Sequence, residues 1–348
     1  MNSDIKRILL KLERNGYEAY IVGGYVRDYL LGVKSVDIDL CTNALPKDVF
    51  RIFKIKKGIS KYGSVSFKYG KYNLDITTYR MESNYNNHRP KTVEYIDNLL
   101  LDIERRDFTI NSICMNKDGK LFDYVSGIND LNNKIINVIG SVDRLKEDPL
   151  RILRAIRFAI CLDFKLSEDI VSFINENKEL IKEISFDRRK IELEKIFISK
   201  NVIKGLELLK ELDLLDILEI KYDRITYVSD VIGLWAQLDF SDNYVFSRSV
   251  LDMIKKIRTI LNDKIINEIT LLNYDLYICI VAGEILGYSK KDINRIYHKM
   301  PINKLKDLKI TNMEIMNLLG IEGSPVVKKI YNDVLEKVIT GKLKNNKR

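Results

Sequence analysis

The spacing of apolar residues changes near residue 145, and this change limits the folds that the chain can adopt. Before about residue 120, short runs rich in β-branched and aromatic residues alternate with stretches of helical spacing. From about residue 145 onward, nearly every segment carries apolar residues at positions i, i+3 and i+4, as in "LRILRAIRFAICL". The pattern predicts an α/β head followed by a long all-α region. The 348 residues indicate two or three domains rather than one core.

Charge and rare residues narrow the possible functions. The chain has 58 Lys and Arg against 49 Asp and Glu, and this net charge of +9 favours a polyanionic partner such as nucleic acid. The alternative is a genome bias, because isoleucine, asparagine and tyrosine are frequent as well. Two histidines cannot form a multi-histidine metal site, so catalysis must depend on carboxylates, arginines and backbone groups.

The cysteines and the apolar runs indicate a protein of the reducing cytoplasm. The four cysteines are scattered without a CxxC motif, so they predict neither a zinc site nor a disulfide framework. No apolar run reaches the roughly 18 residues that a membrane span needs. The N-terminal helix pattern lacks the apolar region of a signal peptide.

Two carboxylates stand one residue apart in the predicted strand "VDIDL". Alternation along a strand places Val36, Ile38 and Leu40 on one face, and it places Asp37 and Asp39 on the other. Neighbouring carboxylates repel each other unless a cation lies between them, and Mg²⁺ prefers such oxygen ligands. A two-metal site would bind the attacking and the leaving oxygen of an in-line displacement. The alternative is a solvent-facing strand whose acids have no role.

A glycine-rich turn precedes this strand. The segment "YIVGGYVRDYLLG" indicates a strand at residues 20–22, then Gly23 and Gly24, then a helix that carries Arg27. Glycines between a strand and a helix let backbone N–H groups approach a phosphate at the positive end of the helix. Arg27 can add a bidentate phosphate contact. A GG turn shortly before a DxD strand therefore predicts a triphosphate site beside a metal site, whereas a GG turn alone is an ordinary turn.

A third carboxylate is available in "NLDITTYR". Here Asp75 alternates with Leu74 and Ile76, so it can face the same side as Asp37 and Asp39. The alternative is a surface aspartate without a role.

The segment "IERRDFTINSICM" combines basic and acidic groups before a short apolar helix pattern. One arginine of the pair Arg105 and Arg106 is a candidate for the triphosphate. Asp107 and Asn111 are candidates for the sugar, where an acceptor can bind a ribose 2′-OH. The alternative role of Asp107 is a helix cap.

The segment "KEDPLRILRAIRFAICLDF" predicts a helix with a basic stripe. Pro149 suits the first helical position and Asp148 suits the N-cap. Arg151, Arg154 and Arg157 recur every third residue, and such a stripe requires an anion nearby. The other face is apolar and consists of Leu150, Leu153, Ile156 and Phe158.

Asp148 and Arg151 are also i, i+3 neighbours, which places an acceptor beside a donor. Cytosine presents its N4 amino group beside the acceptor N3, and adenine presents its N6 amino group beside the acceptor N1. Uracil and guanine present the reverse order. One Asp–Arg pair can therefore accept C and A and exclude U and G. The alternative is a helix cap and a surface arginine.

Together these motifs resemble the class II tRNA nucleotidyltransferases, which comprise the CCA-adding enzymes and the bacterial poly(A) polymerases. The motifs fall in the order of this family and cover about residues 15–200. "GGYVRD" with "DID" is similar to the first family motif, and "RRDFTIN" is similar to the second. The third, fourth and fifth are matched by "FDYVSGINDL", "EDPLR" and "SFDRRKIELEKI".

The resemblance implies three parts of the chain. They are a polymerase-β-like nucleotidyltransferase head at residues 1–140, a helical neck with a nucleotide-selecting helix at 141–200, and a helical body and tail that bind tRNA at 201–348. It also implies Asp37 and Asp39 as catalytic ligands of Mg²⁺. The nucleotide-binding residues that it implies are Gly24, Arg27, Arg105, Asp107, Asp148, Arg151, Arg154 and Arg157.

The implied reaction is template-independent addition of C, C and A to the 3′ end of tRNA from CTP and ATP, with neither a membrane nor a protein partner. CC-adding relatives have a shortened loop between DxD and RRD, whereas residues 78–95 form a loop of nearly full length here. Addition of only CC, of only the final A, or of poly(A) stays open as an alternative. A non-catalytic RNA-binding protein is a further alternative, which the intact carboxylates disfavour.

Overall fold

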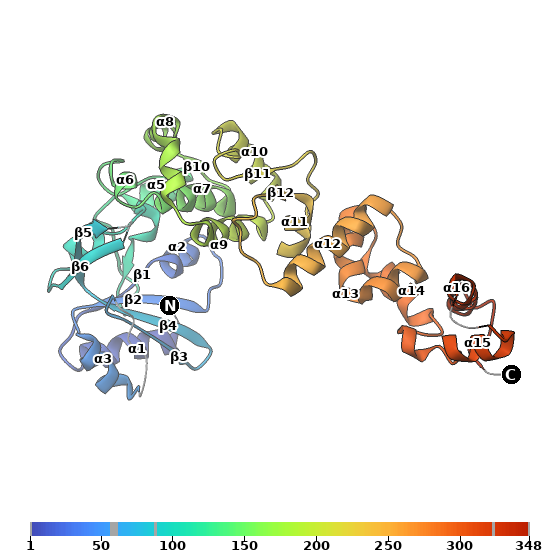
Figure 1. The fold of residues 1–348 in the computed structure, drawn as a ribbon. Coiled ribbons are helices and arrows are strands. Elements are labelled where there is room, and N and C mark those ends of the chain that lie inside the picture. The colour runs from blue at the N-terminus through green and yellow to red at the C-terminus, as the bar shows by residue number, and fades with distance from the viewer. Residues whose placement is uncertain (1, 56–61, 87–88, 322–323, 347–348) are drawn as a thin grey trace. The chain divides into compact units, whose positions relative to one another are not determined.

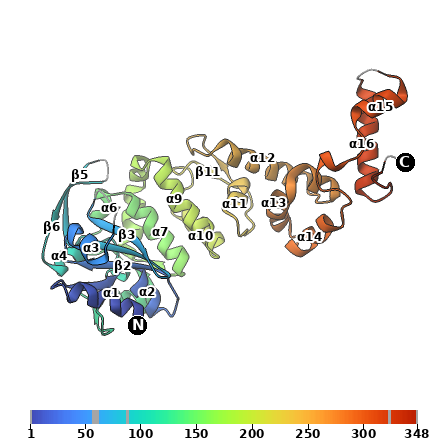
Figure 2. The same ribbon diagram turned by 90° about the horizontal axis from the view of Figure 1, so that it is seen from below.

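The computed structural model describes residues 2–55, 62–86, 89–321 and 324–346, which form two compact units. The first unit extends to Leu218 and the second begins at Glu219. Figures 1 and 2 show the elements of both units. The order of elements confirms the predicted α/β part followed by helices. The domain boundaries expected at residues 140 and 200 stay predictions.

A six-stranded mixed sheet is the centre of the first unit. Its strand order is β3-β4-β2-β1-β7-β8, in which β2 and β4 are parallel and the other neighbours are antiparallel. The strands are β1 (Ala19–Val22), β2 (Asp37–Thr42), β3 (Ser64–Tyr69), β4 (Tyr72–Thr78), β7 (Cys114–Met115) and β8 (Leu121–Phe122). A separate hairpin of β5 (Arg80–Asn86) and β6 (Arg89–Tyr95) forms the loop between DxD and RRD, of which residues 87 and 88 lie outside the described residues.

Strand β2 has one apolar and one acidic face, as its sequence predicts. Ile38 and Leu40 are each 1% exposed, while Asp37 and Asp39 lie on the opposite face. Val36, expected on the apolar face, precedes the strand and is 51% exposed. The apolar face therefore begins at Ile38, because only residues within the sheet are covered by helices.

Helices α1 (Ser3–Glu13) and α3 (Pro46–Phe53) cover the apolar face and lie below the sheet in Figure 1. The ring of Phe53 lies 5.2 Å from the ring of Phe67, which pairs through Leu74 with Ile38. Helix α1 is amphipathic and buries a single stripe. That stripe consists of Ile5, Ile8, Leu9 and Leu12.

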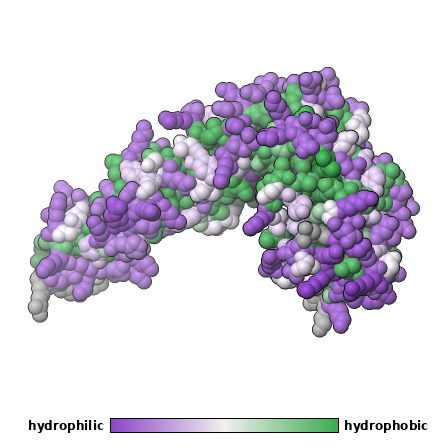
Figure 3. All heavy atoms as spheres, turned by 180° about the vertical axis from the view of Figure 1, so that it is seen from behind, coloured by the Kyte–Doolittle hydropathy of each residue, from purple (hydrophilic) through white to green (hydrophobic). Residues whose placement is uncertain are grey.

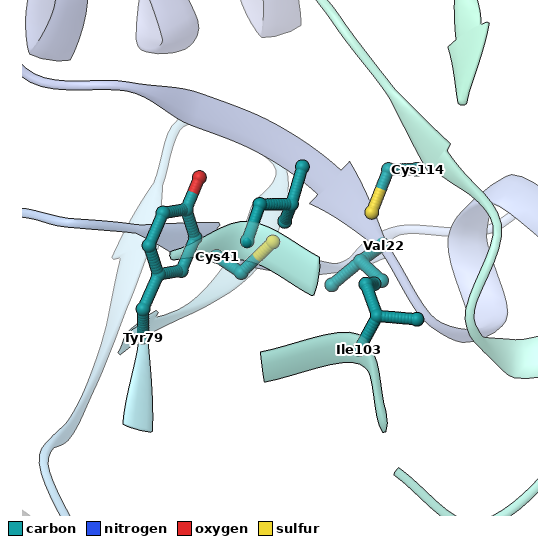
Figure 4. Close-up of a cluster of buried hydrophobic side chains, with 6 residues drawn as sticks. Val22, Cys41, Tyr79, Ile103 and Cys114 are labelled. Carbon is teal, nitrogen blue, oxygen red and sulfur yellow. The ribbon is translucent and has the colours of Figure 1, made fainter. Parts of the chain in front are cut away.

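The face of β2 that carries Asp37 and Asp39 becomes apolar toward the C-terminal end of the strand. Cys41 lies two residues from Asp39 in β2 and therefore shares its face. There it packs in a small core with residues of β1, β7 and helix α4 (Leu99–Glu104), shown in Figure 4. This packing leaves only the end with Asp39 open for polar groups. The core consists of Val22, Cys41, Tyr79, Leu99, Ile103 and Cys114.

The rest of the first unit is helical apart from the short parallel strands β9 (Ile135–Ile136) and β10 (Lys165–Leu166). Helix α7 buries most of its length and packs against α9 and α10. The helices are α2 (Gly24–Leu30), α5 (Gly127–Asn133), α6 (Arg144–Glu147), α7 (Leu150–Leu162), α8 (Glu168–Asn177), α9 (Phe186–Phe197) and α10 (Val202–Glu211), with 3₁₀ turns at Thr109–Asn111 and Lys178–Glu183.

The second unit is helical after a two-stranded ribbon, β11 (Ile220–Lys221) with β12 (Asp239–Phe240). Trp235 is fully buried and packs against the rings of Phe240, Tyr244 and Phe246. On the side shown in Figure 3, hydrophilic residues cover most of this unit, and apolar residues gather on the first unit. The helices of the second unit are α11 (Val231–Gln237), α12 (Arg248–Asp263), α13 (Glu268–Leu286), α14 (Lys290–Lys299), α15 (Asn312–Leu319) and α16 (Pro325–Ile339), with a 3₁₀ turn at Leu305–Asp307.

Helix α13 is long and apolar enough to cross a membrane by length and composition alone. It is broken at Asp275, whose φ of 58° and ψ of 164° are not helical and whose Oδ1 accepts a hydrogen bond from the N–H of Ile278. Helix α13 packs against α12 and α14. A broken helix with such neighbours is typical of the core of a helical unit. Asp275 interrupts the apolar run, so the sequence analysis did not predict a helix of this length and composition.

Candidate active site

The turn between β1 and α2 lies against the carboxylate of Asp39. Strand β1 ends at Val22, Gly23 is the N-cap with a φ of 77°, and α2 begins at Gly24. This is the strand, glycine pair and helix that the sequence predicts. A Cβ atom at Gly23 would lie 2.8 Å from Asp39 Oδ2. Glycine is therefore required both by the positive φ and by the close approach to Asp39.

Strand register brings a third carboxylate onto the acidic face. The parallel strands β2 and β4 pair Asp39 with Asp75 and Asp37 with Asn73, and paired residues share a face. Nδ2 of Asn73 donates to Asp37 Oδ1 at 2.7 Å. Oδ1 of Asp75 is buried and has no hydrogen-bond partner. Of the two roles left open for Asp75, the register supports the one on the face of Asp39.

Burial and mutual repulsion act on these carboxylates. Burial, Asp75 and Asp37 raise the pKa of Asp39, against the opposing charge of Arg106. Burial also raises the pKa of Asp75, against a hydrogen bond from Ser66. A cation among these oxygens would remove the repulsion and provide a partner for the unpaired oxygen of Asp75.

The donor set fits a divalent metal that binds together with a substrate. The described part of the chain contains no group of three His, Cys, Asp or Glu side chains that could hold a metal ion. The carboxylates of β2 would therefore supply only part of a coordination sphere. Mg²⁺ is commonly bound by one or two carboxylates and completed by substrate phosphates and water.

Arg27 is buried on α2 and is held from two sides. Its Nε and Nη2 donate to Asp28 Oδ1 at 2.9 and 2.7 Å. Its Nη1 donates to Asn111 Oδ1 at 2.6 Å. Asn111, a sequence candidate for the sugar, thereby connects the RRD segment to α2. These bonds fix the guanidinium of Arg27 at the same cavity as Asp39.

Asp102, which the sequence analysis did not select, orients the two arginines of RRD. It is fully buried, and it accepts from Arg105 Nε and Arg106 Nη2, both at 2.9 Å, and from the N–H of Arg80 at 3.2 Å. Burial alone would raise the pKa of Asp102, but the charges of Arg106 and Arg105 hold it below its ordinary value. An aspartate three and four residues before two arginines is a pairing signal that the sequence contained.

Each arginine of the basic stripe on α7 pairs with a carboxylate from another segment. The carboxylates come from α6, from RRD and from α9, so protein groups supply the anions that the stripe requires. The pairs are Arg151 Nη1 with Glu147 Oε2 at 3.1 Å, Arg154 Nη2 with Asp107 Oδ2 at 2.5 Å, and Arg157 Nε with Glu192 Oε2 at 2.5 Å.

Phe158, predicted on the apolar face of α7, lies among these arginines. Its ring centre is 3.9 Å from Cζ of Arg157, 5.6 Å from that of Arg154 and 5.4 Å from that of Arg27. Guanidinium groups are attracted to the face of an aromatic ring. The ring therefore connects Arg27 on α2 to the stripe on α7.

Asp148 is neither the N-cap of α7 nor the partner of Arg151 that the sequence predicts. Helix α7 begins at Leu150 and its N-cap is Pro149, so the helix starts one residue later than predicted. Oδ1 of Asp148 still accepts a hydrogen bond from the N–H of Leu150 at 3.2 Å. Its ion pair is with Arg188 of α9, at 3.0 Å. The i, i+3 spacing favours contact with Arg151, but α9 approaches from the side and provides a closer cation.

One cavity of about 490 Å³ in the first unit collects these groups. Eight of the ten site residues that the family resemblance implies line it, while Asp37 and Arg157 lie outside its described lining. The sequence analysis missed Arg80, Glu82, Arg106 and Phe158. The alternation of Arg80 and Glu82 at the start of β5 is a signal that could have placed both on one face. The lining consists of Gly23, Gly24, Arg27, Asp39, Arg80, Glu82, Arg105, Arg106, Asp107, Asn111, Asp148, Arg151, Arg154 and Phe158.

Three family models match successive parts of the chain. Residues 19–137 match the poly A polymerase head domain. Residues 163–222 match the RNA and SrmB-binding site of polymerase A, and residues 245–348 match the tRNA nucleotidyltransferase domain 2. These models cover both the sheet of the first unit and the helices of the second.

Curated relatives and a solved structure match over nearly the whole chain. The CCA-adding enzyme of Ligilactobacillus salivarius is 30% identical over 98% of this chain and 93% of its own length. The CCA-adding enzyme of Geobacillus sp. is 31% identical over 98% of this chain and 93% of its own. The crystal structure of the Bacillus stearothermophilus CCA-adding enzyme in complex with CTP covers 100% of this chain and 95% of its own, with a TM-score of 0.83 and 27% identity.

Replacing Gly23 with alanine should impair nucleotide binding more than it impairs folding. The added Cβ would displace the Asp39 carboxylate, and we expect binding of CTP with Mg²⁺, measured by calorimetry, to weaken about ten-fold or more. Gly32→Ala is the matched control, because Gly32 also has a positive φ of 74° but no atom within 4 Å of the added Cβ. Equal weakening in both variants would contradict the role of the Asp39 contact.

Replacing Asp102 with asparagine should remove a pH-dependent part of the stability. The pKa of Asp102 is lowered in the folded state, so its contribution is present above the unfolded pKa of about 4 and is lost as pH falls through the lower folded value. We expect the melting temperature of Asp102→Asn to be lower than that of the wild type at pH 7, and the difference to shrink toward pH 3. A difference that stays constant over this range would show that the charge of Asp102 does not stabilise the fold.

Proposed function

The chain belongs to the CCA-adding enzymes, and from this premise we propose that it adds C, C and A to the 3′ end of tRNA without a nucleic-acid template. CTP and ATP are the substrates, and each addition releases pyrophosphate. The observation that carries the proposal is the cavity of the first unit, where Asp39, the phosphate-site arginines and the Asp148–Arg151 pair line one space.

We assign the triphosphate to Gly24, Arg27 and Arg105. The backbone at Gly24 starts α2, and the two guanidinium groups line the same cavity. A guanidinium has five N–H donors, and Arg27 donates three hydrogen bonds to Asp28 and Asn111. The remaining donors suit phosphate oxygens, and the protein partners prevent the side chain from rotating away.

We assign the base to Asp148 and Arg151. Asp148 accepts from the amino group of cytosine or adenine, and Arg151 donates to the adjacent ring nitrogen. Uracil and guanine place a carbonyl where Asp148 needs a donor, so they are excluded. Arg154 and Arg157 support the pair by holding α7 to the RRD segment and to α9. Asp107, which anchors Arg154, retains acceptor capacity for the ribose 2′-OH.

We assign the metal to Asp37 and Asp39, with Asp75 beside them. Nucleotidyltransferases of this family use a divalent metal, and we propose Mg²⁺ because all the ligands are hard oxygens. When bound, it would lower the pKa of the tRNA 3′-OH and neutralise the charge of the leaving pyrophosphate. The arginines of the cavity hold the triphosphate in line for attack by that hydroxyl.

The helical part of the chain is proposed to bind tRNA, with residues 141–200 as neck and 201–348 as body and tail. The family models matched by residues 163–222 and 245–348, and the net charge of +9, support this. Neither a membrane nor a protein partner is part of the proposal. We propose the cytoplasm as the location, supported by four cysteines that are all free thiols.

The test is transfer of labelled nucleotide onto a tRNA transcript that ends at the discriminator base. Addition of two C with CTP alone, and of CCA with CTP and ATP together, would establish the proposed activity. Two C without A would assign CC addition, and A added only to tRNA that already ends in CC would assign A addition. Long A-tails on many RNAs would assign poly(A) polymerase activity, which stays an alternative because residues 19–137 match the poly A polymerase head domain. No transfer with any nucleotide would contradict all four.

Alanine at Asp37 or at Asp39 should abolish nucleotide transfer while the fold survives. Removing either carboxylate removes metal ligands, and we expect kcat to fall by about 10³-fold or more. The fold survives because both side chains lie on the open face of β2 and the buried face keeps Ile38 and Leu40. Transfer rates near those of the wild type in either variant would refute the metal assignment. Circular dichroism and the melting temperature serve as controls.

Alanine at Asp148 or at Arg151 should relax the choice among the four nucleotides more than it weakens tRNA binding. Each variant removes one of the two hydrogen bonds that distinguish C and A from U and G, and such contacts contribute about 1–3 kcal/mol of discrimination. The measurement is kcat/KM for each NTP, together with the Kd for tRNA. Unchanged selectivity would reduce the pair to a helix cap and a structural arginine.

A further inference from the structure

Arg188, in the first turn of α9, contacts the base-selecting pair from outside the cavity. Its Nη2 donates to Oδ1 and Oδ2 of Asp148 at 3.1 and 3.0 Å. Arg188 is not among the described residues that line the cavity, whereas Asp148 is. An effect of Arg188 on a bound nucleotide would therefore act through Asp148.

We propose that Arg188 is a positioning residue that fixes the orientation of the Asp148 carboxylate, and thereby maintains the preference for C and A over U and G. This inference rests on the proposed function, in which Asp148 accepts from the amino group of the base.

The contacts of Asp148 hold its carboxylate in one plane. Oδ1 accepts from Arg188 and from the N–H of Leu150, and Oδ2 accepts from Arg188. The two donors belong to different helices, α9 and α7, so rotation of the carboxyl group would break bonds to both. An ionised carboxylate has about four acceptor positions. Oδ2 therefore keeps acceptor capacity toward a base amino group while Arg188 is bound.

The ion pair with Arg188 presents Asp148 as an acceptor at the cavity. A carboxylate is only an acceptor, and it suits the amino groups of cytosine and adenine. Nη2 of Arg188 lies 3.0 Å from Oδ2 of Asp148, and this is the described ion pair of Asp148.

Packing of α9 fixes Arg188 in turn. The next residue, Arg189, is buried and donates to the backbone carbonyls of Ile184, Lys182 and Ile217 at 2.7 to 3.2 Å. One turn later, Glu192 accepts from Arg157. The two adjacent arginines therefore have different tasks: Arg189 anchors α9, and Arg188 extends from the anchored helix to Asp148.

The experiment compares full-length Arg188→Ala and Arg188→Lys with the wild type. Single additions of CTP and of UTP to a tRNA transcript ending at the discriminator base give kcat/KM for each nucleotide. We expect Arg188→Ala to reduce the preference for CTP over UTP about ten-fold or more. Arg188→Lys, which restores a cation and a donor, should recover at least part of it. Lys190→Ala is the matched control, because it also removes a cation from α9. The described ion pair of Lys190 is with Glu194 of the same helix. Lys190→Ala should keep the wild-type preference.

Several results would overturn the inference. One is a preference in Arg188→Ala within two-fold of the wild type. Another is an equal loss in Lys190→Ala, which would show that selectivity follows the general charge or stability of α9. A third is the absence of any recovery in Arg188→Lys when its melting temperature matches that of the wild type. A wild-type enzyme that shows no preference for CTP over UTP would instead contradict the proposed role of Asp148, before Arg188 is considered.

Discussion

The pairing of guanidinium groups with carboxylates is the interaction on which the cavity depends. Six arginines are among its described lining residues, and unpaired they would repel one another in a partly buried space. Two of the pairs join segments that are distant in sequence, Arg154 with Asp107 and Arg157 with Glu192. These two pairs neutralise charge, and they also bind α7 to the RRD segment on one side and to α9 on the other. Asp102 has the same double effect for the RRD segment, because one buried carboxylate holds two arginines and a backbone N–H.

The carboxylates of the sheet and the residues of α7 are held in place in different ways. Strand register places the carboxylates of β2 and β4, and the register cannot shift once Ile38 and Leu40 are buried. Asp148 and Arg151, proposed to select the base, are placed by helix packing and by ion pairs between helices. In the proposed function, chemistry common to all nucleotides would depend on the sheet, and selection among nucleotides would depend on α7 and α9. A change in helix packing would then alter selectivity while Asp37 and Asp39 stay in place.

The sequence was sufficient to predict a feature wherever that feature depends on residues close together in the chain. The alternation in β2 and the turn at Gly23 and Gly24 depend on neighbours within a few residues, and both are present. The sequence was insufficient wherever a side chain takes its partner from a distant segment. Asp148 pairs with Arg188 across forty residues, and no spacing rule distinguishes this partner from Arg151. Phe158 shows the same limit: its helical position predicts a core residue, but only packing reveals the arginines around it.

The charge of the cavity explains why a metal and a nucleotide are expected together. The described lining has six arginines and four carboxylates, an excess of two positive charges. Burial and the neighbouring carboxylates of Asp75 and Asp37 raise the pKa of Asp39, so the end near the turn at Gly23 favours a cation. The arginine-rich end favours an anion. A triphosphate alone carries more negative charge than the arginines leave unbalanced, and a divalent ion alone would face their repulsion. When both are bound, the metal ion neutralises the carboxylate end and the triphosphate neutralises the arginine end. We therefore expect the metal ion and the nucleotide to bind more tightly together than either binds alone.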